Sequence, residues 1–119
     1  MSRMALVVDD SMLIRHTVCR FLEERGFTVE AATQGLEALN LLDRIRPDLI
    51  VTDLQMPRMD GGELIRVVRA RPPLAEVPII VLTGQKKGAP NLEHQVAYVI
   101  YKDISIVEQL DAALTAIHF

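Results

Sequence analysis

The sequence predicts one α/β domain over residues 1–119, in which a doubly wound sheet of parallel strands carries helices on both faces. Three observations support this prediction. The length suits a single compact domain. Half of the residues are apolar, which is enough for a core. Short β-branched runs alternate with segments of helical periodicity, and this alternation is typical of parallel strands joined by right-handed crossovers.

Five strands are predicted. Four of them are apolar runs without polar alternation, as expected for strands that are covered on both faces. These runs are 4–8 (MALVV), 48–52 (DLIVT), 77–82 (VPIIVL) and 97–101 (AYVIY). The fifth run, 27–31 (FTVEA), alternates and is therefore expected nearer the edge of the sheet.

Helical spacing of apolar residues predicts helices over 11–25, 35–45, 62–70 and 105–118. Ser11 is a suitable first residue for the first helix, and Gly26 lies where that helix should stop. Pro47 is expected to end the second helix.

The crossover between the last two strands, residues 84–96, fits a helix poorly. It contains Gly84, Gly88 and Pro90, which penalise a helix interior. We therefore expect a weak or shortened fourth helix there, confined to about 91–96.

Composition excludes several classes of function. The formal net charge is −3, whereas a nucleic-acid-binding domain usually has a basic excess. No apolar stretch approaches the roughly 20 residues that cross a bilayer, and the first residues do not resemble a signal peptide. The single cysteine, Cys19, cannot form an internal disulfide, which fits a reducing compartment. We expect a cytoplasmic protein that binds neither membrane nor nucleic acid.

Five polar side chains fall at the carboxyl ends of predicted strands. These side chains are Asp9 and Asp10 after the first strand, Asp53 after the third, Thr83 after the fourth and Lys102 after the fifth. Ligands of an open parallel sheet bind outside this edge. The sequence therefore brings three carboxylates, one hydroxyl and one ammonium to a single rim.

This set of side chains suits phosphoryl transfer. Clustered carboxylates need a cation, and Mg²⁺ prefers oxygen ligands while keeping positions for water and phosphate oxygens. An aspartate can act as the nucleophile and form an aspartyl phosphate. A lysine and a hydroxyl on the same rim could hold the incoming phosphoryl group.

The sequence resembles the receiver domains of two-component response regulators over essentially its whole length. The resemblance is carried by VVDD (7–10), DLIVTDLQMPRMDG (48–61), VPIIVLTG (77–84) and YVIYK (98–102). It implies a flavodoxin-like, chemotaxis-regulator-like sheet with strand order 2-1-3-4-5, and one receiver domain spanning residues 1–119.

The resemblance also implies a role for each residue of the rim. Asp53 would be the phosphate acceptor, with Thr83 and Lys102 contacting the phosphoryl group. Mg²⁺ would be held by Asp10 directly, by Asp9 mainly through a bound water, by Asp53, and by the backbone carbonyl of Gln55.

A sensor histidine kinase or phosphotransfer protein would be the donor, and phosphorylation would change binding to a downstream protein target or output domain. Such a domain catalyses only its own phosphorylation and dephosphorylation and is not otherwise an enzyme. The resemblance also allows a homodimer.

Three features depart from the family pattern. Asp103 replaces the proline that usually follows the lysine. Val99 occupies the place of a frequent switch aromatic, and Tyr98 beside it should face the other side of the strand. The chain between Thr83 and Lys102 is shorter than usual by about three residues, close to one helical turn.

These departures keep one alternative open, a phosphorylation-independent interaction module, which is a pseudo-receiver that retains the acidic pocket. The chemistry of the pocket would also allow a stand-alone phosphohydrolase with an aspartyl nucleophile, although we expect no cap or second domain that would bind its substrate.

Overall fold

The computed structural model describes residues 3–56, 58–84 and 96–119. Five parallel strands form one sheet in the order β2-β1-β3-β4-β5, as predicted. The strands are β1 (Arg3–Val8), β2 (Phe27–Ala32), β3 (Leu49–Asp53), β4 (Ile79–Thr83) and β5 (Tyr98–Tyr101). The alternating run at 27–31 does form the edge strand β2.

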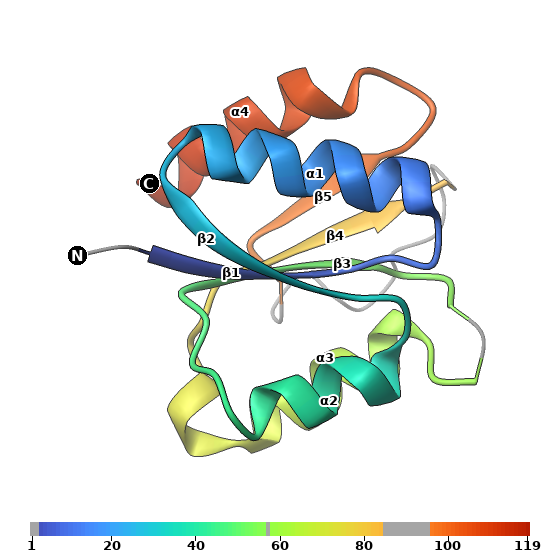
Figure 1. The fold of residues 1–119 in the computed structure, drawn as a ribbon, viewed down its shortest axis with the longest axis vertical. Coiled ribbons are helices and arrows are strands. Elements are labelled where there is room, and N and C mark those ends of the chain that lie inside the picture. Colours follow the sequence, from blue (N-terminus) through green and yellow to red (C-terminus); the bar gives the residue numbers. More distant parts are fainter. Residues whose placement is uncertain (1–2, 57, 85–95) are drawn as a thin grey trace.

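Helices cover both faces of the sheet (Figure 1). They are α1 (Met12–Glu24), α2 (Gly35–Leu42), α3 (Gly61–Ala70), a short 3₁₀ turn (Pro72–Leu74) and α4 (Ile106–Ile117). The first and last helices lie on one face, and α2 and α3 lie on the other. Two apolar clusters fill the interfaces, one containing Val7 and Val51 and the other Leu6 and Ile50, so alternate strand residues serve opposite layers.

The predicted limits of the first helix agree with the structure. The Ser11 side chain accepts a hydrogen bond from the Ile14 N–H at 3.3 Å, which caps the start of α1. Gly26 follows the helix with φ of +92°, a conformation that favours glycine.

The predicted end of the second helix was wrong. The helix ends at Leu42 rather than at 45, and Pro47 does not end it. The reason is a tightened last turn, in which the Asp43 and Arg44 N–H groups bond carbonyls three residues earlier. The segment predicted as a weak fourth helix, 91–96, lies almost wholly outside the described residues. The helix predicted over 105–118 is α4.

Within 3–56, 58–84 and 96–119, none of the helices combines the length and the apolarity that a bilayer crossing needs. The strand register, rather than the helices, positions the polar rim. Val8 of β1 is level with Thr52 of β3, and Thr83 of β4 is level with Tyr101 of β5. The residues that follow these pairs therefore meet at one edge.

Candidate functional site

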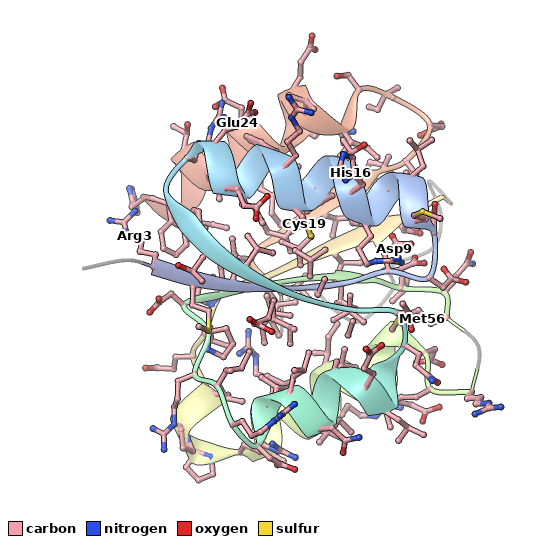
Figure 2. All side chains as sticks on the ribbon, viewed as in Figure 1. Arg3, Asp9, His16, Cys19, Glu24 and Met56 are labelled. Atoms are coloured by element: carbon pink, nitrogen blue, oxygen red, sulfur yellow. The ribbon has the colours of Figure 1, made fainter. Side chains whose placement is uncertain are left out.

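The carboxyl edge of the sheet brings Asp9, Asp10 and Asp53 together as the sequence predicted. One oxygen from each carboxylate lies within 4.8 Å of the others. Asp9 is completely buried, Asp53 is 3% exposed and Asp10 is exposed. Figure 2 shows Asp9 at the end of β1, beside the start of α1. The cluster thus has two buried acids and one that faces solvent.

The two oxygens of Asp9 differ in their surroundings. Oδ1 accepts a hydrogen bond from the Ser11 N–H at 2.8 Å. Oδ2 is buried and accepts no hydrogen bond of good geometry within the described part of the chain. A buried carboxylate oxygen left in this way is costly, so it calls for a cation or a cation-bound water.

Lys102 supplies one positive charge to the cluster. Its Nζ lies 3.1 Å from Asp9 Oδ2 and 3.1 Å from Asp53 Oδ2. Its backbone N–H donates to the Thr83 carbonyl at 2.9 Å, so the pairing of β5 with β4 delivers the lysine to the rim. Burial alone would lower the pKa of the ammonium, but contacts with Asp9 and Asp53 outweigh it and hold this pKa above the usual value of 10.5.

Asp53 is held in an environment that disfavours its charge when no metal ion is bound. Burial first, and then the Asp9 charge, raise the pKa of Asp53 above 3.8, although the Gln55 N–H and Lys102 act in the opposite direction. The Gln55 N–H donates to Asp53 Oδ1 at 3.2 Å. A single ammonium therefore does not fully compensate the buried acids.

The loop after Asp53 packs tightly against that residue. A Cβ on Gly61 would lie 2.4 Å from the Asp53 carbonyl oxygen and 2.8 Å from Leu54 Cα. The Gly61 N–H donates to the Leu54 carbonyl at 2.9 Å, and Asp60 caps α3 by accepting from the Glu63 N–H at 2.8 Å. Only glycine permits this close return of the chain.

The two remaining predicted side chains lie on the same rim. Thr83 is the buried last residue of β4, opposite Tyr101. Gln55 is exposed and contacts Asp53 through its N–H, while the metal contact of its carbonyl stays a prediction. Val99 pairs with Val81 on β4, whereas Tyr98 packs into the cluster beneath α1 and α4, as alternation predicted.

Sequence reasoning missed two groups that support the site. The Arg15 Nη1 donates to the Asp9 carbonyl at 2.8 Å. The Gln109 side chain bonds both backbone groups of Tyr101, the residue before Lys102. The helical spacing of 11–25 and 105–118 places both residues on helices, but it gives no sign of bonds from helix to strand end.

The cluster fits a divalent cation that takes oxygen ligands. It offers carboxylate oxygens from Asp9, Asp10 and Asp53, and the Lys102 ammonium beside Asp9 and Asp53 does not fully compensate the buried acids. Mg²⁺ suits this donor set because it uses one or two carboxylates and completes its shell with water or phosphate oxygens.

Comparison with known proteins agrees with the resemblance that the sequence motifs indicate. The family described as "Response regulator receiver domain" matches residues 5–114. The response regulator MprA of Mycobacterium sp. (strain KMS) is 44% identical over 80 residues, which are 67% of this chain and 34% of that protein. The chain thus spans about a third of the length of such relatives.

Solved structures resemble the chain along nearly its whole length. The chemotaxis response regulator CheY4 of Vibrio cholerae has a TM-score of 0.84 and 31% identity, covering 97% of this chain and 98% of that one. The signal receiver domain of a signal transduction histidine kinase from Syntrophus aciditrophicus has a TM-score of 0.83 and 31% identity, covering 98% and 91%.

Proposed function

The chain belongs to the response regulator receiver domains of two-component signalling, and from that premise we propose that it accepts a phosphoryl group on Asp53. The donor is a sensor histidine kinase or a phosphotransfer protein. The proposal entails a cytoplasmic location, since a histidine kinase draws its phosphoryl group from ATP. We assign the receiver domain to residues 1–119.

The contact that carries the proposal is the one between Lys102 and Asp53. An ammonium 3.1 Å from a nearly buried carboxylate orients that carboxylate for attack and faces the oxygens of an incoming phosphoryl group. In the transfer, an Asp53 oxygen bonds to phosphorus while the bond from phosphorus to the donor imidazole nitrogen breaks. The electron pair of that bond stays on the imidazole nitrogen.

The acidic cluster would hold Mg²⁺ during the reaction. Asp10 and Asp53 would offer carboxylate oxygens directly, and Asp9 would act mainly through a metal-bound water. The Gln55 carbonyl is the proposed third protein contact. When bound, the ion neutralises charge on the phosphoryl oxygens. The protein would catalyse only its own phosphorylation and dephosphorylation. The rest of its role would be to change which partner it binds.

Phosphorylation would act as a switch through the neighbouring strand ends. The phosphoryl group adds negative charge next to Lys102, and the Thr83 hydroxyl can donate a hydrogen bond to it. Movement of Thr83 would alter the surface that a downstream protein target, an output domain or a second copy of the chain binds.

Exposed apolar residues follow two of the strand ends of the rim in the sequence. Met12 and Leu13 are both 74% exposed and directly follow the acidic pair and Ser11. Ile104 and Val107, also exposed, follow Lys102. We propose that a donor presenting a phosphohistidine to Asp53 covers these residues. Leu13→Ser should therefore slow transfer from the kinase and leave phosphorylation by acetyl phosphate unchanged.

A titration with fluoroberyllate in Mg²⁺ tests the proposed acceptor, because this reagent attaches to an aspartate as a phosphoryl mimic. We expect NMR shift changes around Asp53 and Lys102 in the unsubstituted chain and none in Asp53→Asn. Absence of change at millimolar reagent would overturn the proposal. Partner binding that is unchanged by Asp53→Asn would instead favour the pseudo-receiver module.

A further inference from the structure

One side chain on α4 is hydrogen-bonded to the end of β5. Gln109 Oε1 accepts from the Tyr101 N–H at 2.9 Å, and Gln109 Nε2 donates to the Tyr101 carbonyl at 2.8 Å. The same Nε2 also donates to the Ser105 carbonyl at 3.1 Å. A single amide thus bonds both backbone groups of one strand residue, as a neighbouring strand would.

The bonds occur where the sheet lacks a neighbour. β5 is an edge strand, and an edge strand presents backbone groups that no further strand pairs. Lys102 turns its N–H inward to the Thr83 carbonyl, so Tyr101, one residue earlier, turns its backbone groups outward. Gln109 satisfies these outward groups on the strand residue that immediately precedes the lysine.

Two backbone bonds also act at this point, from the Lys102 N–H to the Thr83 carbonyl at 2.9 Å and, at a long 3.5 Å, from the Ile104 N–H to the Tyr101 carbonyl. The residue after Lys102 is the exposed Asp103, which does not stiffen the backbone as a proline there would. Lysine is also a long, flexible side chain, and holding its ammonium in one place costs conformational entropy. A fixed Cα reduces the number of positions that the ammonium can reach.

We propose that Gln109 is a positioning residue that fixes the end of β5 and thereby holds the Lys102 ammonium against Asp9 and Asp53. Gln109 itself touches neither carboxylate nor the reacting atoms. The chemical consequence rests on the proposed function, because Lys102 matters for catalysis only if a phosphoryl group arrives at Asp53.

Two substitutions distinguish the effect of the Gln109 hydrogen bonds from the effect of its side-chain volume. Gln109→Leu keeps much of the volume and removes all three hydrogen bonds. Gln109→Glu keeps the shape and the acceptor for the Tyr101 N–H, but it replaces the donor to Tyr101 and Ser105 with an oxygen. Ala116→Leu adds a leucine at an exposed position two turns further along α4 and serves as the control.

The decisive readout compares two ligands of the same pocket. Mg²⁺ alone is held by the acidic residues, and the Lys102 ammonium competes with it for Asp9 and Asp53, so its affinity should not fall in any of the three variants. Fluoroberyllate in saturating Mg²⁺ also contacts Lys102, so Gln109→Leu and Gln109→Glu should bind it roughly tenfold more weakly, the loss expected from one or two hydrogen bonds. A generally loosened pocket would weaken both ligands together.

Amide hydrogen exchange tests the tether without any ligand. We expect the Tyr101 and Lys102 amides to exchange roughly tenfold faster in Gln109→Leu than in Ala116→Leu. Fluoroberyllate affinity equal in Gln109→Leu and the unsubstituted chain would overturn the inference. If the unsubstituted chain binds no fluoroberyllate, the proposed function fails. In that case, equal exchange of the Lys102 amide in Gln109→Leu and Ala116→Leu would also overturn the proposed positioning role of Gln109.

Discussion

Replacing Asp53 with asparagine should stabilise the metal-free protein at neutral pH, although the acceptor is lost. Asp53 is nearly buried, and its carboxylate lies within 4.8 Å of another buried acid, Asp9. Asparagine has almost the same shape and no charge. The substitution therefore removes repulsion and the cost of burying a charge, and it also removes the attraction to Lys102.

The size of the effect follows from these opposing contributions. At an effective dielectric constant of about 20, unit charges 4.8 Å apart repel by about 3.5 kcal/mol. At the same dielectric constant, the ammonium 3.1 Å from Asp53 attracts it by about 5 kcal/mol. Burying the carboxylate costs several kcal/mol more. The repulsion and the cost of burial together exceed the attraction, in the direction that the raised pKa of Asp53 also indicates, so we expect a net gain on the order of 1 kcal/mol.

The effect should depend on pH in a defined direction. The raised pKa means that the folded protein holds the Asp53 proton more tightly than the unfolded chain does. The unsubstituted chain therefore loses stability as pH rises from the unfolded value of 3.8 through the folded pKa. Below that range Asp53 is protonated in both states, so the advantage of Asp53→Asn should disappear.

Urea unfolding in EDTA, at neutral pH and again below pH 3.8, measures this difference. Asp43→Asn is the control, because Asp43 is an exposed acid paired with Arg71 at 3.1 Å and should change stability by less than about 1 kcal/mol. A metal-free Asp53→Asn protein that is less stable than the unsubstituted chain at neutral pH would refute the reasoning.

Two further predictions concern the loop and the metal. Gly61→Ala should destabilise the protein by about 1 to 3 kcal/mol, because the new Cβ would meet the backbone of Asp53 and Leu54. Gly84→Ala, where nothing in the described part of the chain lies within 4 Å, should change stability by less than about 0.5 kcal/mol, and thermal melts of both variants measure the difference. Mg²⁺ at about 100 times its Kd should stabilise the unsubstituted chain by about 2.7 kcal/mol, and Asp10→Asn should lose most of this gain in a calorimetric scan. Equal gains in both proteins would contradict the metal site.

The sequence was most informative where physical rules act locally. Buried parallel strands appear as apolar runs, so the ends of β1, β3, β4 and β5 could be predicted closely enough to gather Asp9, Asp53, Thr83 and Lys102 at one edge. The prediction of the site does not require the exact last residue of each strand, because the carboxyl ends of all the parallel strands lie at the same rim.

Other features depend on contacts between distant residues and leave no local signal. The three-residue spacing of Leu36, Leu39 and Leu42 continues to Ile45, but the backbone tightens after Leu42 and the helix stops. The amphipathic pattern of 105–118 predicts α4. It does not predict that the half-buried Gln109 bonds to β5, because those bonds depend on how the helix packs against the strand. The ion pairs of Lys102 likewise arise only from the packed sheet.

The most direct test of the central claim is to locate the phosphoryl group. The chain is phosphorylated in Mg²⁺ by acetyl phosphate or by a partner kinase, reduced with borohydride to convert an aspartyl phosphate into homoserine, and sequenced by mass spectrometry. We predict homoserine at Asp53, and none when EDTA replaces Mg²⁺. Homoserine at another aspartate with Asp53 intact, or no conversion in Mg²⁺, would contradict the account.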